Sequence, residues 1–170
     1  MNLQSTLSNE LIQIVPIAAS DFNELFAIAS DELLWEQHPE KDRYKKDVFQ
    51  DFFNIAMQSK SAFKIVDVKT GETIGSTRYY DFNEKQKSVA IGYTFISRKY
   101  WGTSYNRALK DLMINYAFQF VENIIFHVGD TNFRSQKAVE KLGALHTETL
   151  IDEENGRTHV TYTLTKENWK

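Results

Sequence analysis

The chain has 170 residues, a formal net charge of −3 and no cysteine. This length fits a single domain, residues 1–170, that can bury roughly 70% of the surface of its unfolded chain. The absence of cysteine excludes disulfides, thiolate catalysis and cysteine-ligated metals. The mildly negative charge argues against a nucleic-acid partner, and no apolar run approaches the ~18 residues of a membrane helix. We therefore expect a cytoplasmic protein.

The first half of the chain changes from helical to strand-like periodicity near residue 60. Asp21 and Glu24 are spaced as in a capping box ahead of an apolar run, which predicts a helix to about Ser30. Apolar residues at helical spacing predict a second helix over 43–57. Runs rich in β-branched and aromatic residues predict strands at 11–17, 62–68, 73–80 and 88–97.

The second half of the chain alternates between helices and strands. Asn132 or Thr131 can cap the later of two helices, and Gly143 ends it. The strand at 123–128 is nearly all apolar, which is typical of a strand buried on both faces. The expected elements are helices at 105–120 and 133–142 and strands at 123–128, 144–151 and 157–165. The order β-α-α-β-β-β-α-β-α-β-β predicts an α/β (α+β) fold with a mixed sheet covered by helices.

A short turn at 97–106 joins an expected strand to an expected helix and contains Gly102. The start of a helix presents several backbone N–H groups with the positive end of the helix dipole behind them. Such an array favours a phosphate or pyrophosphate. The pattern alone is not specific, because many strand–helix turns need a glycine and small hydroxyl residues. An ordinary N-capped helix is the alternative.

Two motifs together resemble the GNAT acetyltransferase superfamily. The first is the turn Lys99-Tyr-Trp-Gly102-Thr-Ser104, and the second is Asn132-Phe-Arg-Ser135, followed by a helix that ends in Lys141-Leu-Gly143. The chain is most similar to the branch of bacterial ribosomal-protein N-acetyltransferases, which often reads Tyr-Trp-Gly-Thr-Gly before its main helix. The resemblance covers nearly the whole chain. It implies a mostly antiparallel sheet with one splayed parallel strand pair, flanked by helices.

The resemblance implies acetyl-CoA as the co-substrate, held where the two parallel strands splay apart. The end of the strand at 88–97 would contact the pantetheine arm, and the turn would cradle the pyrophosphate. Ser104 stands where glycine or alanine is commonest, but serine is small and its hydroxyl can itself contact phosphate. The implied cofactor-binding residues are Phe95, Ile96, Ser97, Arg98, Lys99, Trp101, Gly102, Thr103, Ser104, Tyr105, Asn106, Asn132, Arg134, Ser135 and Lys137.

Acetyl transfer needs a neutral amine and a proton for the departing thiolate. Many superfamily members carry a tyrosine for that proton where this chain has Val139, so the resemblance assigns the role to Ser135, whose alternative is a capping serine. His127 is the candidate base on a strand near the cleft, although a lone histidine on an apolar strand is more often structural. Glu36 and His38 are candidates in the loop that shapes the acceptor site, where most charged residues are solvated. Weaker candidates are Asp81 and Tyr79.

The branch resemblance favours a protein or peptide α-amino group as acceptor, attacked directly in a ternary complex. A small amine (polyamine, amino acid or aminoglycoside) and a non-catalytic CoA-binding sensor stay open as alternatives. We expect no metal, because the four histidines show no ligand spacing such as His-x-x-x-His. A homodimer is common for this family.

Overall fold

One eight-stranded sheet organises residues 1–169, which are the residues that the computed structural model describes. Its order is β1-β2-β3-β4-β5-β6-β8-β7, and every neighbouring pair is antiparallel except β5 and β6. The strands are β1 (Leu7–Ser8), β2 (Ile12–Pro16), β3 (Ala62–Asp67), β4 (Thr73–Asn83), β5 (Ser88–Ile96), β6 (Asn123–Gly129), β7 (Leu145–Ile151) and β8 (Thr158–Thr165). The predicted mixed sheet is confirmed. The short strand β1 was not predicted.

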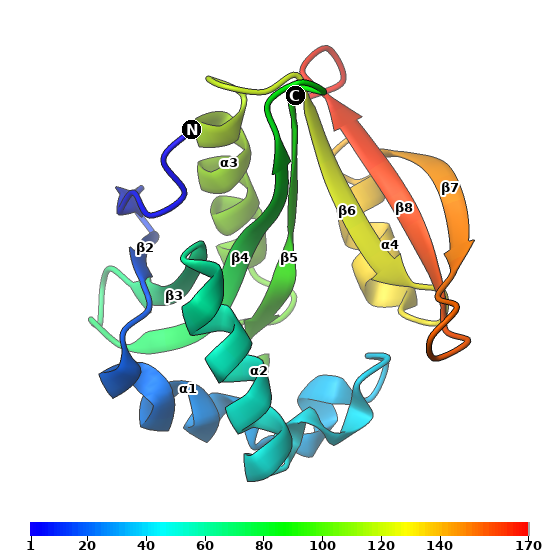
Figure 1. Cartoon of the computed structure of the whole chain (residues 1–170). Helices are drawn as coiled ribbons and strands as arrows, with labels where there is room; N and C mark the ends of the chain where they lie inside the picture. Colours follow the sequence, from blue (N-terminus) through cyan, green and yellow to red (C-terminus); the bar gives the residue numbers. More distant parts are fainter. Residues whose placement is uncertain (170) are drawn as a thin grey trace.

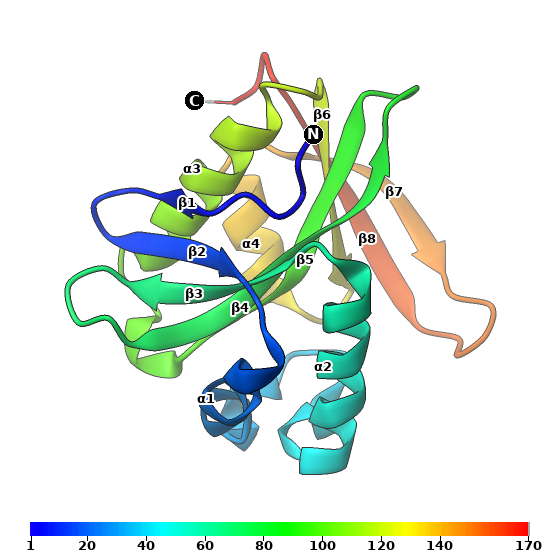
Figure 2. The ribbon, with the colours of Figure 1, turned by 60° about the vertical axis from the view of Figure 1, so that its left-hand side comes forward.

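Two layers of helices flank this sheet. Figures 1 and 2 show α3 and α4 against one face, and α1 and α2 beyond the other face at one end of the sheet. The α-helices are α1 (Phe22–Ala29), α2 (Lys46–Ser59), α3 (Tyr105–Ala117) and α4 (Phe133–Glu140). Short 3₁₀ helices are η1 (Ala19–Asp21), η2 (Glu32–Trp35), η3 (Lys41–Tyr44) and η4 (Arg98–Tyr100). Within residues 1–169, no helix combines the length and apolar character needed to cross a bilayer.

The parallel pair β5 and β6 is short and then diverges. The two strands pair over three residues, from Ser88 opposite Asn123 to Ala90 opposite Ile125. Beyond these pairs they separate toward the end of the sheet where η2 and η3 lie (Figure 1). A β-bulge at Tyr93, with φ of 51°, shifts the register of β5 against β4 in the same region. A bulge bends its strand, so it accounts for the turn of β5 away from β6.

Two apolar clusters hold this arrangement. The larger lies between the sheet and the helices α3 and α4, and includes Leu109, Met113 and Phe126. The smaller joins α1, α2, η2 and the end of β5. Its buried members are Leu25, Ala29, Leu34, Trp35, Phe49, Phe53 and Phe95. The second cluster therefore fixes η2 and α2 beside the diverging end of β5.

Two local expectations were wrong. The capping box from Asp21 to Glu24 does not form, because Asp21 closes the preceding turn η1 and accepts from Ala18 N–H at 2.8 Å. Glu24 instead accepts from Thr73 at 2.7 Å. The strand at 123–128 was expected to be buried on both faces, yet His127 is exposed. That face is open because β5 has turned away from β6.

Candidate functional site

The turn before α3 presents free backbone amides at the start of a helix. The first intrahelical bond runs from Ala108 N to Ser104 O, so earlier amides lie outside the helical ladder. Within residues 1–169, the amides of Gly102, Ser104 and Asn106 have no hydrogen-bond acceptor. Gly102 has φ of 72°, and a Cβ added to it would meet nothing within 4 Å. These free amides and the open space fit a pyrophosphate.

Aromatic side chains fix the turn to the sheet. Trp101 Nε1 donates to Ile96 O at the end of β5, at 3.0 Å. The Tyr100 hydroxyl donates to Asp67 Oδ2 at 3.1 Å. Tyr100 also contacts Tyr105, with 4.6 Å between the ring centres. The amides of the turn are therefore held in position before any ligand binds.

The two basic residues of the turn form surface ion pairs. Arg98 Nε lies 2.5 Å from Asp31 Oδ2, and Lys99 Nζ lies 3.1 Å from Glu72 Oε2. All four side chains are at least one-third exposed. Exposed pairs of this kind are worth only about 0–1 kcal/mol, so a phosphate could compete for either cation.

The second sequence motif begins α4 and touches the turn. Asn132 Oδ1 accepts from Ser135 N–H at 3.3 Å, which confirms the predicted helix cap. The Arg134 guanidinium lies 3.7 Å from the centre of the Trp101 ring. Ser135 is half-buried and Lys137 is exposed. The structure thus brings the two predicted cofactor motifs together.

The end of β5 already uses part of its backbone. Ser97 N–H donates to Ile74 O on β4 at 2.8 Å, and Ile96 O accepts from the turn. The Phe95 side chain is buried against Trp35, with ring centres 5.5 Å apart. Pantetheine contacts at Phe95, Ile96 and Ser97 remain predictions.

A buried lysine that sequence reasoning missed lies between the diverging strands. Lys110 on α3 is 7% exposed, and its Nζ lies 3.3 Å from Thr94 Oγ1 on β5. The same Nζ lies 5.7 Å from the ring centre of Phe126 on β6. Burial lowers the pKa of Lys110 to about 8. From the sequence alone, a lysine in this helix is expected to be solvent-exposed, because only the tertiary fold buries it.

On the opposite face, Tyr80 crosses from β4 to β6. Its hydroxyl is hydrogen-bonded to His127 Nδ1 at 2.8 Å. Gly92 on β5 leaves room for this crossing, since a Cβ there would lie 3.0 Å from the Tyr80 ring. Burial, and secondarily the nearby His159, lower the pKa of His127. A neutral imidazole therefore lies beside the divergence.

The other two predicted bases, Glu36 and His38, lie in the 31–44 segment. Glu36 is exposed; burial lowers the pKa of Arg134 at the start of α4, and the charge of Glu36 offsets part of that lowering. Burial lowers the pKa of His38 to about 3, and Arg43 contributes to that shift. Its Nδ1 already accepts from Glu40 N–H at 2.9 Å. His38 is therefore neutral but poorly suited to take up a proton.

The two weaker candidates lie apart from each other. The Tyr79 hydroxyl donates to Met113 O in the core beneath α3, at 2.7 Å. Asp81 is exposed on β4. Burial lowers the pKa of His127, and the negative charge of Asp81 offsets part of that lowering. Tyr79 thus serves packing, whereas Asp81 influences His127 through its charge.

Two buried arginines also lie beside the divergence and were missed from sequence. Arg78 on β4 is 4% exposed, and its guanidinium carbon lies 4.1 Å from the centre of the Tyr93 ring. Arg43 on η3 is 9% exposed and lies 4.4 Å from the centre of the Phe52 ring. One feature of the sequence could have indicated the burial of Arg78: it is a charged residue inside the strand expected at 73–80.

Residues 31–44, which contain η2 and η3, span the open end between the strands. Asp31 binds the turn through Arg98, and Gln37 Oε1 accepts from Arg134 N–H of α4 at 3.4 Å. Pro39 packs so closely on the end of β6 that a Cβ on Gly129 would lie 2.6 Å from it. Glu40 forms an ion pair with Arg157, just before β8. The 31–44 segment therefore connects both arms of the divergence.

No cluster of three or more histidine, aspartate or glutamate residues suited to a metal occurs in the described part of the chain. The chemistry available at the site is that of free amides, hydroxyls, imidazoles and buried cations.

The sequence matches the family model described as acetyltransferase (GNAT) domain over residues 12–145. No curated protein matches it. A GCN5-related N-acetyltransferase from Brucella melitensis is 16% identical with a TM-score of 0.84, covering 98% of this chain and 80% of that one. A GNAT-family acetyltransferase from Bacillus anthracis is 17% identical with a TM-score of 0.78, covering 96% and 99%.

Another similar structure is spermidine N-acetyltransferase from Vibrio cholerae in complex with CoA and spermine. It is 15% identical with a TM-score of 0.72, covering 94% of this chain and 98% of that one. At such identities these likenesses show the fold.

Proposed function

Because the chain belongs to the GNAT acetyltransferase family, we propose that its acceptor is the α-amino group of a protein or peptide, attacked directly in a ternary complex. Acetyl-CoA is the co-substrate of this N-acetyltransferase and supplies the acetyl group as an activated thioester. The amides of Gly102, Ser104 and Asn106 would hold its pyrophosphate.

The observation that carries the proposal is the hydrogen bond between Tyr80 and His127 across the divergence. An α-amino group has a pKa of about 8, so a sizeable fraction of it is neutral at physiological pH. Such an amine needs only a modest base, and the neutral imidazole of His127 meets that need directly or through water. A side-chain amine with a pKa of about 10.4 would need a stronger base.

Ser135 supplies the second proton role in this proposal. It lies in the first turn of α4, one residue from Arg134, whose guanidinium contacts the turn before α3. Its hydroxyl has no hydrogen-bond partner within residues 1–169, so it is available to protonate the departing sulfur. Val139 is buried in the core and has no such access.

A polyamine acceptor is the main competing proposal, and the spermidine enzyme has the same fold. Here, however, the buried charges beside Tyr93 are the cations Arg43 and Arg78. Two cations repel a polycationic acceptor. This arrangement supports the peptide over the polyamine.

An acceptor screen tests the proposal. The purified protein and acetyl-CoA would be incubated with one acceptor at a time: an N-terminal peptide, spermidine or kanamycin. The acetylated products would be identified by mass. We expect acetylation at the peptide α-amino group and little on spermidine. Matched peptides with a blocked N-terminus and a free lysine are the control. Transfer to spermidine alone, or to lysine alone, would overturn the assignment.

A further inference from the structure

The guanidinium of Arg78 is buried without a counter-ion. It is 4% exposed, and its Nε and Nη2 have no hydrogen-bond partner. It forms no ion pair within residues 1–169, and its closest aromatic neighbours are Tyr93 and Phe52, at 4.1 and 5.5 Å. A buried charge is normally paired, because removing it from water is costly. Ring faces compensate only part of that cost.

Arg43 adds a second cation at the same place. Both guanidiniums lie against the ring of Phe52, Arg43 at 4.4 Å from its centre. The guanidinium of Arg43 contacts His38 Nε2 at 3.5 Å, a neutral group. The nearby carboxylate of Glu40 is held by Arg157. Two like charges in one apolar setting repel each other, so the site gains most from an anion that binds between or beside them.

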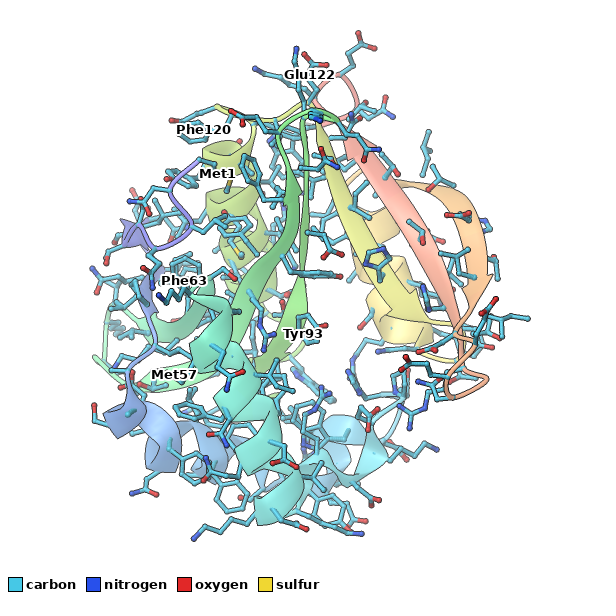
Figure 3. All side chains as sticks on the ribbon, viewed as in Figure 1. Met1, Met57, Phe63, Tyr93, Phe120 and Glu122 are labelled. Carbon is cyan, nitrogen blue, oxygen red and sulfur yellow. The ribbon has the colours of Figure 1, made fainter. Side chains whose placement is uncertain are left out.

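The position of Arg78 connects it to the acceptor. Arg78 is in register with Gly92 on β5, two residues beyond Ala90, the last residue of β5 that pairs with β6. Adjacent strands are about 4.8 Å apart, so the Arg78 side chain reaches the start of the divergence. Figure 3 shows Tyr93, its ring neighbour, beside β5 on the side that faces β6. The free amides for the pyrophosphate lie at the start of α3 instead.

We propose that Arg78, assisted by Arg43, binds a carboxylate of the acetyl acceptor. The acceptor class is then an amine with a carboxylate a few bonds away, and the peptide form is an N-terminus with Asp or Glu among its first residues. Arginine suits this task because its planar fork binds both carboxylate oxygens at once. This inference rests on the proposed function.

Matched acceptor pairs test the inference. Peptides that begin Ser-Glu and Ser-Gln differ in charge but hardly in shape, and Glu can also be moved to the first or third position. We expect kcat/KM to be at least about tenfold higher for the best Glu peptide than for its Gln partner, as a charge-assisted hydrogen bond gives. Free glutamate and free glutamine are tested as acceptors in the same way. Acetylation of free glutamate would show that the carboxylate belongs to a small molecule.

Substitutions assign the preference to Arg78. We expect R78M to bring the Glu/Gln ratio close to 1 and R78K to leave it intermediate, because lysine keeps the charge but not the fork. K87M is the matched control, since it removes one positive charge from an exposed pair with Glu122. It should retain the full ratio. Acetyl-CoA affinity and thermal unfolding, measured for each variant, show whether the site is still folded.

The outcomes separate the two proposals. Equal rates on Glu and Gln peptides in the wild type, or a ratio that survives in R78M, would overturn the carboxylate site and leave peptide acetylation intact. Acetylation of free glutamate without any peptide would retain the carboxylate site and overturn the peptide acceptor.

Discussion

Ser135 combines a structural amide and a chemical hydroxyl in one residue. Its N–H completes the cap from Asn132, while its Oγ points to no protein partner within residues 1–169. Alanine keeps the amide and removes the hydroxyl. A substitution here can therefore separate folding from proton transfer, which is rarely possible at a helix start.

We expect S135A to lower kcat at least about tenfold while changing acetyl-CoA affinity little, because general-acid groups typically contribute more than that to a transfer step. Steady-state kinetics and cofactor titration measure the two effects. N132A is the comparison variant, and loss of its cap should cost about 1 kcal/mol of stability. An unchanged kcat in S135A would remove Ser135 as the acid.

Lys110 is a residue whose charge opposes folding. Its pKa is lowered by burial to about 8 from 10.5, so below pH 8 the folded protein carries a buried ammonium. As pH rises from about 8 to 10.5, the folded form loses this proton before the unfolded form does. The unfolded state then binds more protons, so the free energy of unfolding contributed by Lys110 rises with pH in that window.

K110M should therefore be more stable than the wild type at pH 7, by up to about 3 kcal/mol. The advantage should shrink between pH 8 and 10. Urea unfolding at pH 7 and pH 9.5 measures it, and the difference between variant and wild type cancels other titrating groups. Thr94 keeps its hydrogen bond to Thr77 at 2.9 Å, so no polar group is orphaned. A pH-independent difference would show that burial does not shift the pKa of Lys110 between the unfolded and folded states.

At the scale of elements, the turn before α3 was predictable because its signals are local. Gly102, the small hydroxyl residues and the following amphipathic run all lie within one short stretch. The 31–44 segment was not predictable in the same way. Its contacts with Arg98 and Arg134 join residues that are 67 and 97 positions apart along the chain, and Pro39 meets Gly129 on β6, so no local pattern predicts them.

The same reasoning explains the missed arginine site. The pattern of β4 predicted a strand, but which face each side chain takes depends on the bulge at Tyr93 and on the position of α2. Arg78 reads as a solvated strand residue until Phe52 covers it. The turn before α3 and the Asn132 cap of α4 were thus predictable from two local motifs, whereas the burial of Arg78 depends on tertiary packing.

G102V tests the turn as an element. Valine at φ of 72° is strained, and its side chain would occupy the open space beside the free amides. We expect acetyl-CoA affinity to fall at least about tenfold, because phosphate binding depends on that space. G156V is the matched control, since Gly156 has φ of 68° and equally open surroundings in the β7–β8 turn. It should lose similar stability but keep its affinity, and equal losses of affinity would refute the cradle.

The whole molecule has two arms, one on each side of the short β5–β6 ladder. One arm contains β1 to β5 with α1 to α3, and the other contains β6 to β8 with α4 (Figure 1). Three residue pairs of the β5–β6 ladder, the larger apolar cluster beneath α3 and α4, and the contacts of the 31–44 segment link them. A ligand that touches both the turn before α3 and the start of α4 adds a further link. Binding should then change the dynamics of elements that lie on different arms.

We expect CoA to slow amide hydrogen exchange together at the start of α3, at the start of α4 and in the 31–44 segment. The β1–β2 hairpin is the internal control, because Leu7 and Ile14 pair at the far edge of the sheet. At 100 times its Kd, CoA should also stabilise the fold by about 2.7 kcal/mol. Slowing confined to the start of α3 would mean that CoA holds one arm only. In that case Asn132 and Ser135 would lie outside the cofactor site, and their roles would have to be sought in the packing of α4.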